Sequence, residues 1–210
     1  MNFSRLASCY SLSTRSWEKF VLDHSRNHDR LKQILKTHSV RFGDFVLASG
    51  QRSNLYVDCR LTTLRAEAMP LIGRLFVAKM QERGWQPDAV GGLTMGADPV
   101  VTAVAREALE YGQIINAFLI RKEAKQHGRQ KFIEGLDEPA GKNVVIVDDV
   151  CTTGGSTIKA IEAAREAGMT VLGALCLVDR EQGGGEAIEQ QHNCPFDRIF
   201  TMAELIDQPK

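Results

Sequence analysis

The sequence predicts an α/β fold with a mostly parallel, doubly wound sheet, and two observations carry this prediction. Runs of apolar and β-branched residues, typical of strands buried on both faces, recur along the chain. Segments with apolar residues at helical spacing alternate with them, which is typical of parallel strands joined by helical crossovers. The predicted strands are 88–93, 114–120, 144–147, 170–178 and 197–200, and the predicted helices are 66–84, 100–111, 158–167, 187–191 and 203–206.

Length and composition bound the class of protein. A chain of 210 residues is most simply one domain with a substantial core. Its 26 basic and 26 acidic residues balance, so bulk charge does not indicate a nucleic-acid or membrane partner, and no apolar run approaches a membrane span. The five cysteines show no metal-ligand spacing, which predicts small packed residues in a reducing cytoplasm. They are Cys9, Cys59, Cys151, Cys176 and Cys194.

The first residues are expected to be an extension. Residues 1–17 contain Arg5, Arg15, five serines and no acid, a composition that organellar transit peptides share. A short disordered extension, or a start codon set too early, explains so short a stretch more simply, and we favour that interpretation. Residues 1–28 are therefore predicted to be an N-terminal extension, partly disordered, and residues 29–210 a single domain.

A helical segment and a hairpin come next. Residues 17–38 show two apolar faces at helical spacing, and the polar stretch 25–28 separates them, so a two-helix lead-in and one broken helix both fit. Within 42–60, two aromatic-rich strand candidates flank the turn signal 49–53, which predicts a hairpin. Tyr56 in this hairpin is either a packed strand aromatic or a contact to a ligand.

A glycine-containing turn follows the predicted strand 88–93. It precedes the helix 100–111, and glycine between a strand and a helix allows the backbone to approach an anion closely. A plain strand–helix connection is the alternative. The turn residues are Thr94, Met95, Gly96 and Ala97.

Strand 114–120 leads into a basic segment, residues 121–131, with six basic groups and one acid. Runs of charge are more often solvated faces than sites. Gly128 would permit the backbone of this segment to swing. Its basic residues are Arg121, Lys122, Lys125, His127, Arg129 and Lys131.

The most informative stretch is 144–157. Four β-branched residues predict a buried strand that ends at Asp148 and Asp149. The glycines and hydroxyl residues that follow, leading into a helix, suit a phosphate, although the lysine of a P-loop is missing. Two carboxylates beside a phosphate need sugar hydroxyls or a divalent cation, so the stretch predicts a phosphorylated sugar with Mg²⁺; a structural turn with solvated aspartates is the alternative. The loop comprises Val150, Cys151, Thr152, Thr153, Gly154, Gly155, Ser156 and Thr157.

Arg180 follows the predicted strand 170–178 in the sequence Val-Asp-Arg. A residue just past the carboxyl end of a strand faces the ligand crevice in open α/β folds. A guanidinium group there is suited to a carboxylate, which it binds with two parallel hydrogen bonds. The glycine-rich stretch 181–185 is predicted to be a mobile loop.

These motifs resemble a known family. The strand, acid pair and loop of 144–157 resemble the PRPP-binding stretch of the type I phosphoribosyltransferases, where PRPP is 5-phosphoribosyl 1-diphosphate. The hairpin resembles the N-terminal hood of the orotate phosphoribosyltransferases, F-x-L-K-S-G-x-x-S-x-x-Y/F-x-D, and the spacing R-K-x-x-K-x-H-G of 121–128 resembles their catalytic loop. Ala48 and Gly96 depart from the pattern, since relatives often carry lysine at these positions.

The resemblance implies a type I phosphoribosyltransferase fold with a hood at about 29–65, a core at about 66–210 and a flexible catalytic loop. The implied activity is transfer of the phosphoribosyl group of PRPP to orotate, giving orotidine 5′-monophosphate and pyrophosphate in de novo pyrimidine biosynthesis, with Mg²⁺. The implied protein is a cytoplasmic homodimer whose catalytic loop reaches the neighbouring subunit, with no nucleic-acid or membrane partner.

The resemblance also implies roles for single residues. Asp148 and Asp149 would hold the ribose hydroxyls and, through water and PRPP, the metal. The implied catalytic residues are Lys122, Lys125, His127, Asp148 and Asp149. PRPP binding is implied for these five and for Arg121, Thr94, Met95, Gly96, Ala97, Val150, Cys151, Thr152, Thr153, Gly154, Gly155 and Ser156. Orotate binding is implied for Thr152, Arg180, Tyr56 and Val57.

Two other functions use the same residues. A phosphoribosyltransferase for a purine or uracil is favoured by Ala48, but the spacing of the basic segment and Arg180 count against it. A non-catalytic regulator that senses PRPP would be expected to append a DNA-binding segment or to lose the basic residues. Here the lead-in is short and the basic segment is complete.

Overall fold

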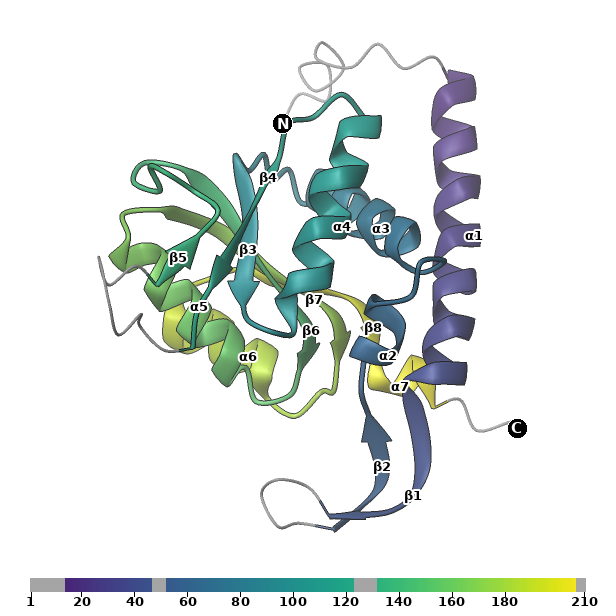
Figure 1. Ribbon diagram of the computed structural model, residues 1–210. Coiled ribbons are helices and arrows are strands. Elements are labelled where there is room, and N and C mark those ends of the chain that lie inside the picture. Colours follow the sequence, from purple (N-terminus) through teal and green to yellow (C-terminus); the bar gives the residue numbers. More distant parts are fainter. Residues whose placement is uncertain (1–13, 47–51, 123–131, 207–210) are drawn as a thin grey trace.

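The computed structural model describes residues 14–46, 52–122 and 132–206. Its centre is a six-stranded sheet of order β5-β4-β3-β6-β7-β8, in which every neighbouring pair is parallel except β4 and β5. The predicted mostly parallel sheet is therefore confirmed (Figure 1). The strands are β3 (Ala89–Leu93), β4 (Asn116–Ile120), β5 (Ile133–Glu134), β6 (Asn143–Cys151), β7 (Thr170–Asp179) and β8 (Phe196–Thr201).

Helices cover both faces of the sheet. Along β6, Val145 and Val147 belong to one core cluster with the helices α3 and α4, whereas Val144 and Ile146 belong to a second cluster with α5 and α6. Because side chains alternate along a strand, a run apolar at every position supplies both cores. The doubly wound arrangement is confirmed. The covering helices are α3 (Met69–Glu82), α4 (Ala97–Glu110), α5 (Gly155–Glu166) and α6 (Gly184–His192).

The chain enters the fold through one continuous helix, α1 (Thr14–His38). Both sequence interpretations of this segment, two helices or one broken helix, were wrong. The polar stretch 25–28 contains neither proline nor glycine, so it does not end a helix. Leu31 and Leu35 are fully buried in the first core. The predicted boundary between extension and domain, after residue 28, lies inside this helix and stays a prediction.

The predicted hairpin is confirmed as a separate two-stranded antiparallel sheet, β1 (Val40–Val46) and β2 (Arg52–Val57). We call this sheet the hood. Figure 1 shows that it projects away from the central sheet. A four-residue helix that the sequence did not predict, α2 (Arg60–Thr63), connects it to α3. No helix in the described ranges is both long enough and apolar enough to cross a membrane.

Several element boundaries differ from the prediction, and one matters for function. The strand β6 does not end at Asp148 but continues to Cys151, because β7 is long enough to pair with it as far as Asp179. The helices at both predicted loops also begin early, α5 at Gly155 and α6 at Gly184. Both helices begin at a glycine, and because glycine has a low helix propensity the sequence pattern did not predict these starts. The chain ends in α7 (Met202–Leu205), with a capping box at Thr201.

Candidate active site

The acid pair, Asp148 and Asp149, lies near the carboxyl end of the strand β6. Asp148 is buried, with 5% of its surface exposed, and each of its oxygens accepts one hydrogen bond: the Thr157 hydroxyl donates to Oδ2 at 3.1 Å and the Asp149 backbone N–H donates to Oδ1 at 3.0 Å. Burial, followed by the neighbouring charge of Asp149, raises the pKa of the Asp148 carboxyl to about 7. Burial raises the pKa of Asp149 as well. The site is therefore a desolvated carboxylate pair.

The turn between β3 and α4 packs directly on the acid pair. A side-chain Cβ placed on Gly96 would lie 2.5 Å from Asp149 Oδ1 and 2.9 Å from Asp148 Oδ1. A side chain at this position would require the two carboxylates to shift, because the atoms that it would meet belong to the aspartate side chains. The turn thus presents its backbone next to the carboxylates. Met95 in the same turn is 62% exposed, and the peptide bond between Thr94 and Met95 is cis.

The predicted phosphate loop forms a cavity of about 330 Å³ at the N-terminus of α5. Gly154 caps this helix with a left-handed backbone (φ +79°), which places Gly155, Ser156 and Thr157 in the first turn, where N–H groups have no partner within the helix. Such a turn is suited to a phosphate. The cavity is lined by Asp148, Val150, Thr152, Thr153, Gly154, Gly155, Ser156, Thr157 and Lys159.

Lys159 is a site residue that the sequence analysis missed. The loop has no lysine of the kind found in a P-loop, but Lys159 in the second turn of α5 lines the same cavity. The sequence signal was present: a basic residue stands two positions after the last loop hydroxyl. The cavity therefore combines hydroxyl groups, helix N–H groups and one cation around an expected anion.

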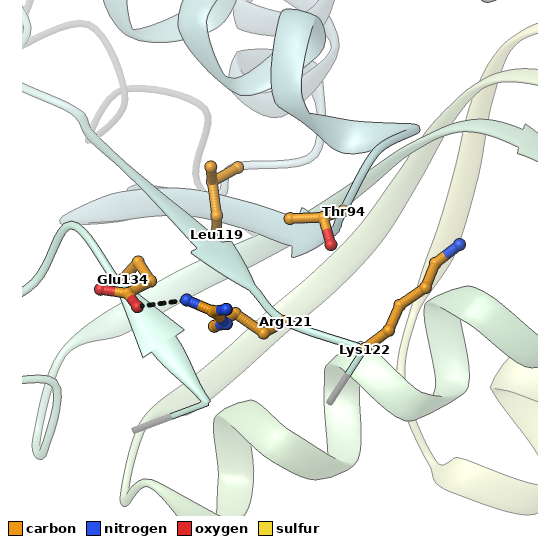
Figure 2. Close-up of a pocket in the computed structure, with 5 residues that line it drawn as sticks. All are labelled: Thr94, Leu119, Arg121, Lys122 and Glu134. Carbon is orange, nitrogen blue, oxygen red and sulfur yellow. Dashed lines mark hydrogen bonds and ion pairs between the residues drawn. The ribbon is translucent and has the colours of Figure 1, made fainter. Parts of the chain in front are cut away.

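A second cavity, of about 430 Å³, is bordered by the turn after β3 and the beginning of the basic segment. Figure 2 shows Thr94 and Lys122 at this cavity, while the Arg121 guanidinium turns toward Glu134, to which Nη1 donates at 3.2 Å. The short strand β5, which was not predicted, supplies Glu134 and pairs with β4. The cavity is lined by Thr94, Leu119, Arg121, Lys122 and Glu134.

The two ends of the basic segment are held together. The Arg121 backbone N–H donates to the Phe132 carbonyl at 2.8 Å, and Ile120 pairs with Ile133 in the sheet. The segment therefore leaves and rejoins the protein at the carboxyl end of β4, beside the second cavity. Lys125 and His127 lie outside the described residues, as does Ala48.

Arg180 lies one strand away from the phosphate loop. Its backbone N–H donates to the Cys151 carbonyl at 2.8 Å, which joins the ends of β6 and β7. Its side-chain Nε is buried and, among the described residues, has no hydrogen-bond partner. A buried donor without an acceptor is costly unless a ligand supplies one. Arg180 and Thr152 are thus brought to the same edge of the sheet.

The two hood residues predicted to contact the base differ in their surroundings. Tyr56 is 38% exposed and its ring lies 5.4 Å from that of Phe45, centroid to centroid. Val57 is partly buried and packs against the first core. Successive side chains of a strand point to opposite faces, so the structure does not place these two together.

The donor set of the acid pair fits Mg²⁺. This ion prefers oxygen ligands and is usually held by one or two carboxylates, with water and substrate phosphates completing its coordination. Adjacent carboxylates with raised pKa values provide two such oxygens and a local excess of negative charge once ionised. The described residues contain no group of three or more acidic, histidine or cysteine ligands, so a dedicated protein cage is not found there. The four described cysteines are free and buried, as predicted.

Comparison with known proteins identifies the family of this chain. The model of the phosphoribosyl transferase domain matches residues 62–200. The orotate phosphoribosyltransferase of Synechocystis sp. is 43% identical over 175 residues, which is 83% of this chain and 86% of that protein.

Solved structures give the same result. The orotate phosphoribosyltransferase of Mycobacterium tuberculosis H37Rv matches with a TM-score of 0.77 and 38% identity in a complex with Fe(III) dicitrate, covering 86% of this chain and 99% of that one. In a complex with PRPP, the TM-score is 0.73 and the identity 35%, over 85% of this chain and 98% of that one. The acid pair, the phosphate loop and the hood identified above are thus found in a chain that belongs to the orotate phosphoribosyltransferase family.

Proposed function

We propose that this protein is an orotate phosphoribosyltransferase, which transfers the 5-phosphoribosyl group of PRPP to orotate and releases pyrophosphate, in de novo pyrimidine biosynthesis. One observation carries the proposal: a carboxylate pair, a loop suited to a phosphate and a buried guanidinium nitrogen that has no partner among the described residues lie at one edge of the sheet. These three groups match a sugar, its phosphate and an acidic base. Family membership supports the same activity.

PRPP would bind across the two cavities. The loop residues 152–157 would hold the 5′-phosphate through helix N–H groups and hydroxyls. Asp148 and Asp149 would accept hydrogen bonds from the ribose hydroxyls, and they would hold Mg²⁺ through water and PRPP oxygens. The bound ion would neutralise part of the charge on the pyrophosphate. The turn 94–97 would contact the pyrophosphate through its backbone.

Orotate would bind between the hood and the end of β7. The buried Nε of Arg180 would donate to the orotate carboxylate, which supplies the acceptor that this nitrogen lacks among the described residues. Thr152 would add a hydroxyl from the neighbouring strand end, and Tyr56 would lie against the ring from the hood. Contact of Val57 with the base remains a prediction.

In the reaction, a ring nitrogen of orotate forms a bond to C1 of the ribose as the C1–O bond to pyrophosphate breaks, and the proton of that nitrogen passes to water or to the released pyrophosphate. Negative charge grows on the leaving group, and the cations of the basic segment stabilise it: Arg121, Lys122, Lys125 and His127. Closure of the segment over the site would exclude water that would otherwise hydrolyse PRPP. We propose a cytoplasmic homodimer in which this segment reaches the neighbouring subunit.

The test is the loss of orotate absorbance in the presence of PRPP and Mg²⁺, with uracil, hypoxanthine and adenine assayed in parallel. Consumption of orotate alone is expected. In the Arg180→Gln variant, the KM for orotate should rise by at least about tenfold while the KM for PRPP changes little. Turnover of a different base would refute the proposal that orotate is the substrate. Saturable PRPP binding without turnover of any base would favour a non-catalytic regulator that senses PRPP.

A further inference from the structure

Asp179, the last residue of β7, is a buried carboxylate that none of the proposed roles uses. It is 4% exposed. Its Oδ1 accepts a hydrogen bond from the Glu181 backbone N–H at 2.8 Å, and its Oδ2 accepts one from Nη1 of Arg198, on β8, at 3.2 Å. Asp179 therefore links the strand β8 to the chain immediately after Arg180, the residue proposed to bind the orotate carboxylate.

Hydrogen bonds hold the peptide groups on both sides of Arg180. The Arg180 N–H donates to the Cys151 carbonyl at 2.8 Å, and the next N–H along the chain, that of Glu181, donates to Asp179. Each peptide group is planar, so a residue has only two soft backbone dihedral angles, φ and ψ. Because the planes before and after the Arg180 Cα are both held, these two angles are fixed, and the direction of its Cα–Cβ bond is fixed with them.

The bond to Asp179 also supports an unusual backbone conformation. Glu181 has a left-handed φ of +56°. A residue with a side chain adopts this conformation at a cost of roughly 1 to 2 kcal/mol. Two contacts oppose the cost: Asp179 accepts the Glu181 N–H, and Glu181 Oε2 accepts from the Ala203 N–H in α7 at 3.4 Å. Without the Asp179 carboxylate, the chain after Arg180 is expected to relax and to turn the Arg180 side chain.

Stability alone is a weak reason for this arrangement. The Arg198 side chain is 45% exposed, so it replaces only part of the hydration that the buried carboxylate has lost. What the carboxylate holds is a better reason. The Arg180 Nε is buried and has no hydrogen-bond partner among the described residues. A donor that is kept for a ligand has no bond of its own to fix it there, so neighbouring groups must set its position.

We propose that Asp179 is a positioning residue for selection of the base: its carboxylate fixes the backbone around Arg180, so that the guanidinium meets the carboxylate of the bound base. The proposal rests on the proposed function for the identity of that base. Asp179 acts through Arg180 and does not itself touch the substrate. Its removal should therefore weaken orotate, while PRPP, held at the acid pair and the phosphate loop, should bind almost as before.

The chain offers a matched control in Glu107 of α4, a second buried carboxylate, which is 3% exposed. Its Oε2 accepts from Arg74 Nε at 3.1 Å and its Oε1 from Arg106 Nη1 at 2.8 Å. The helix begins at Ala97, beside the turn that packs on the acid pair, and Glu107 lies about 15 Å further along the helix axis. Asp179→Ala and Glu107→Ala both remove a buried carboxylate that binds arginine, one near the site and one far from it.

The KM for orotate and kcat are measured by turnover at saturating PRPP, PRPP affinity by calorimetry with Mg²⁺, and stability by thermal melting. Asp179→Ala is expected to raise the KM for orotate at least about tenfold, with a smaller change in kcat and with PRPP affinity within about twofold of the wild type. Glu107→Ala should leave all three within about twofold, even where its melting temperature falls as far. A KM for orotate within about twofold of the wild type in Asp179→Ala, an equal rise in Glu107→Ala, or an equal loss of PRPP affinity would overturn the proposal.

Asp179→Asn decides the matter if Asp179→Ala does not fold. Its amide has one oxygen for two donors, so the KM for orotate should rise at least about threefold, while the isosteric control Glu107→Gln stays within about twofold of the wild type. An unchanged KM for orotate in Asp179→Asn overturns the proposal.

A second readout uses no substrate. Hydrogen exchange of the Arg180 Nε–H, followed by NMR and assigned by its absence from Arg180→Gln, reports whether this nitrogen stays buried. Asp179→Asn is expected to speed the exchange at least about threefold, and Glu107→Gln is expected to leave it unchanged. Equal exchange in Asp179→Asn and the wild type would overturn the proposal. A wild type that does not consume orotate would refute the proposed function, and the exchange rate would still decide whether Asp179 positions Arg180.

Discussion

Replacing Asp148 by asparagine should stabilise the ligand-free protein while it abolishes turnover. Burial and the charge of Asp149 raise the pKa of Asp148 from 3.8 to about 7, so the folded protein holds a carboxylate that resists ionisation. The pKa is raised by about 3, and each pKa unit corresponds to about 1.36 kcal/mol. Above pH 7, ionisation of this group therefore lowers the free energy of unfolding by roughly 4 kcal/mol at most. The carboxamide keeps one acceptor where the carboxylate has two, so we expect a gain of about 2 kcal/mol at pH 8.

The dependence on pH gives this prediction its sharpest form. Because the folded pKa lies above the unfolded value, the contribution of the protonated group is fully present below pH 3.8 and is lost as the pH rises through about 7. The advantage of Asp148→Asn over the wild type should therefore be largest at pH 8 and should shrink toward pH 4. For a chain of this size, 2 kcal/mol corresponds to about 4 to 8 °C in melting temperature.

The assay is thermal melting in EDTA at several pH values, with the exposed Asp137→Asn as control. A variant no more stable than the wild type at pH 8, or a gain that does not change with pH, would refute the reasoning. Addition of Mg²⁺ and PRPP should raise the melting temperature of the wild type but not that of Asp148→Asn, since ligands stabilise only the protein that binds them. A functional carboxylate pair that costs stability is a usual trade-off at active sites.

Four further changes test other parts of the site. Thr157→Val removes the hydroxyl that donates to Asp148, so it should destabilise the protein by about 1 to 2 kcal/mol at pH 8 and much less at pH 5, as seen by denaturant unfolding. Gly96→Ala places a methyl group 2.5 Å from Asp149 Oδ1, so turnover should fall at least about tenfold while the melting temperature changes by only a few degrees; unchanged turnover would contradict the packing of this turn on the acid pair. Lys159→Met should weaken PRPP binding about threefold at low salt and less at high salt, because salt screens the attraction between this exposed cation and the phosphate. Lys142→Met, at the amino end of β6, is the control. Lys125→Ala should lower kcat far more than it lowers PRPP affinity, and equal losses in rate and binding would argue against a role in the closed state.

The local patterns predicted most of the fold because each strand and helix carries its own signal. The β6 segment is apolar at four consecutive positions, and the structure shows why: Val144 and Ile146 serve one core, and Val145 and Val147 the other. The predictions were wrong where the extent of a strand depends on pairing with a neighbouring strand and not on local sequence preference. β6 continues through two aspartates because β7 pairs with it, and β5 is too short to carry a pattern.

The candidate site divides in the same way. Chemistry that lies in one stretch of chain, the acid pair with its hydroxyl and glycine loop, could be predicted from residue types alone. Contacts between stretches could not. The approach of Gly96 to the carboxylates, the pairing of Arg121 with Glu134 and the position of Lys159 in the phosphate cavity depend on distances across the fold.

By itself the sequence determined the fold class, the acid pair and the family, because these depend on periodicity and on contiguous motifs. Only the tertiary structure decided that Asp148 is buried with two donors and that Arg180 keeps a buried nitrogen without a partner among the described residues. The physical reason is that desolvation and electrostatic coupling depend on which groups surround a side chain in space, and no local pattern specifies those neighbours.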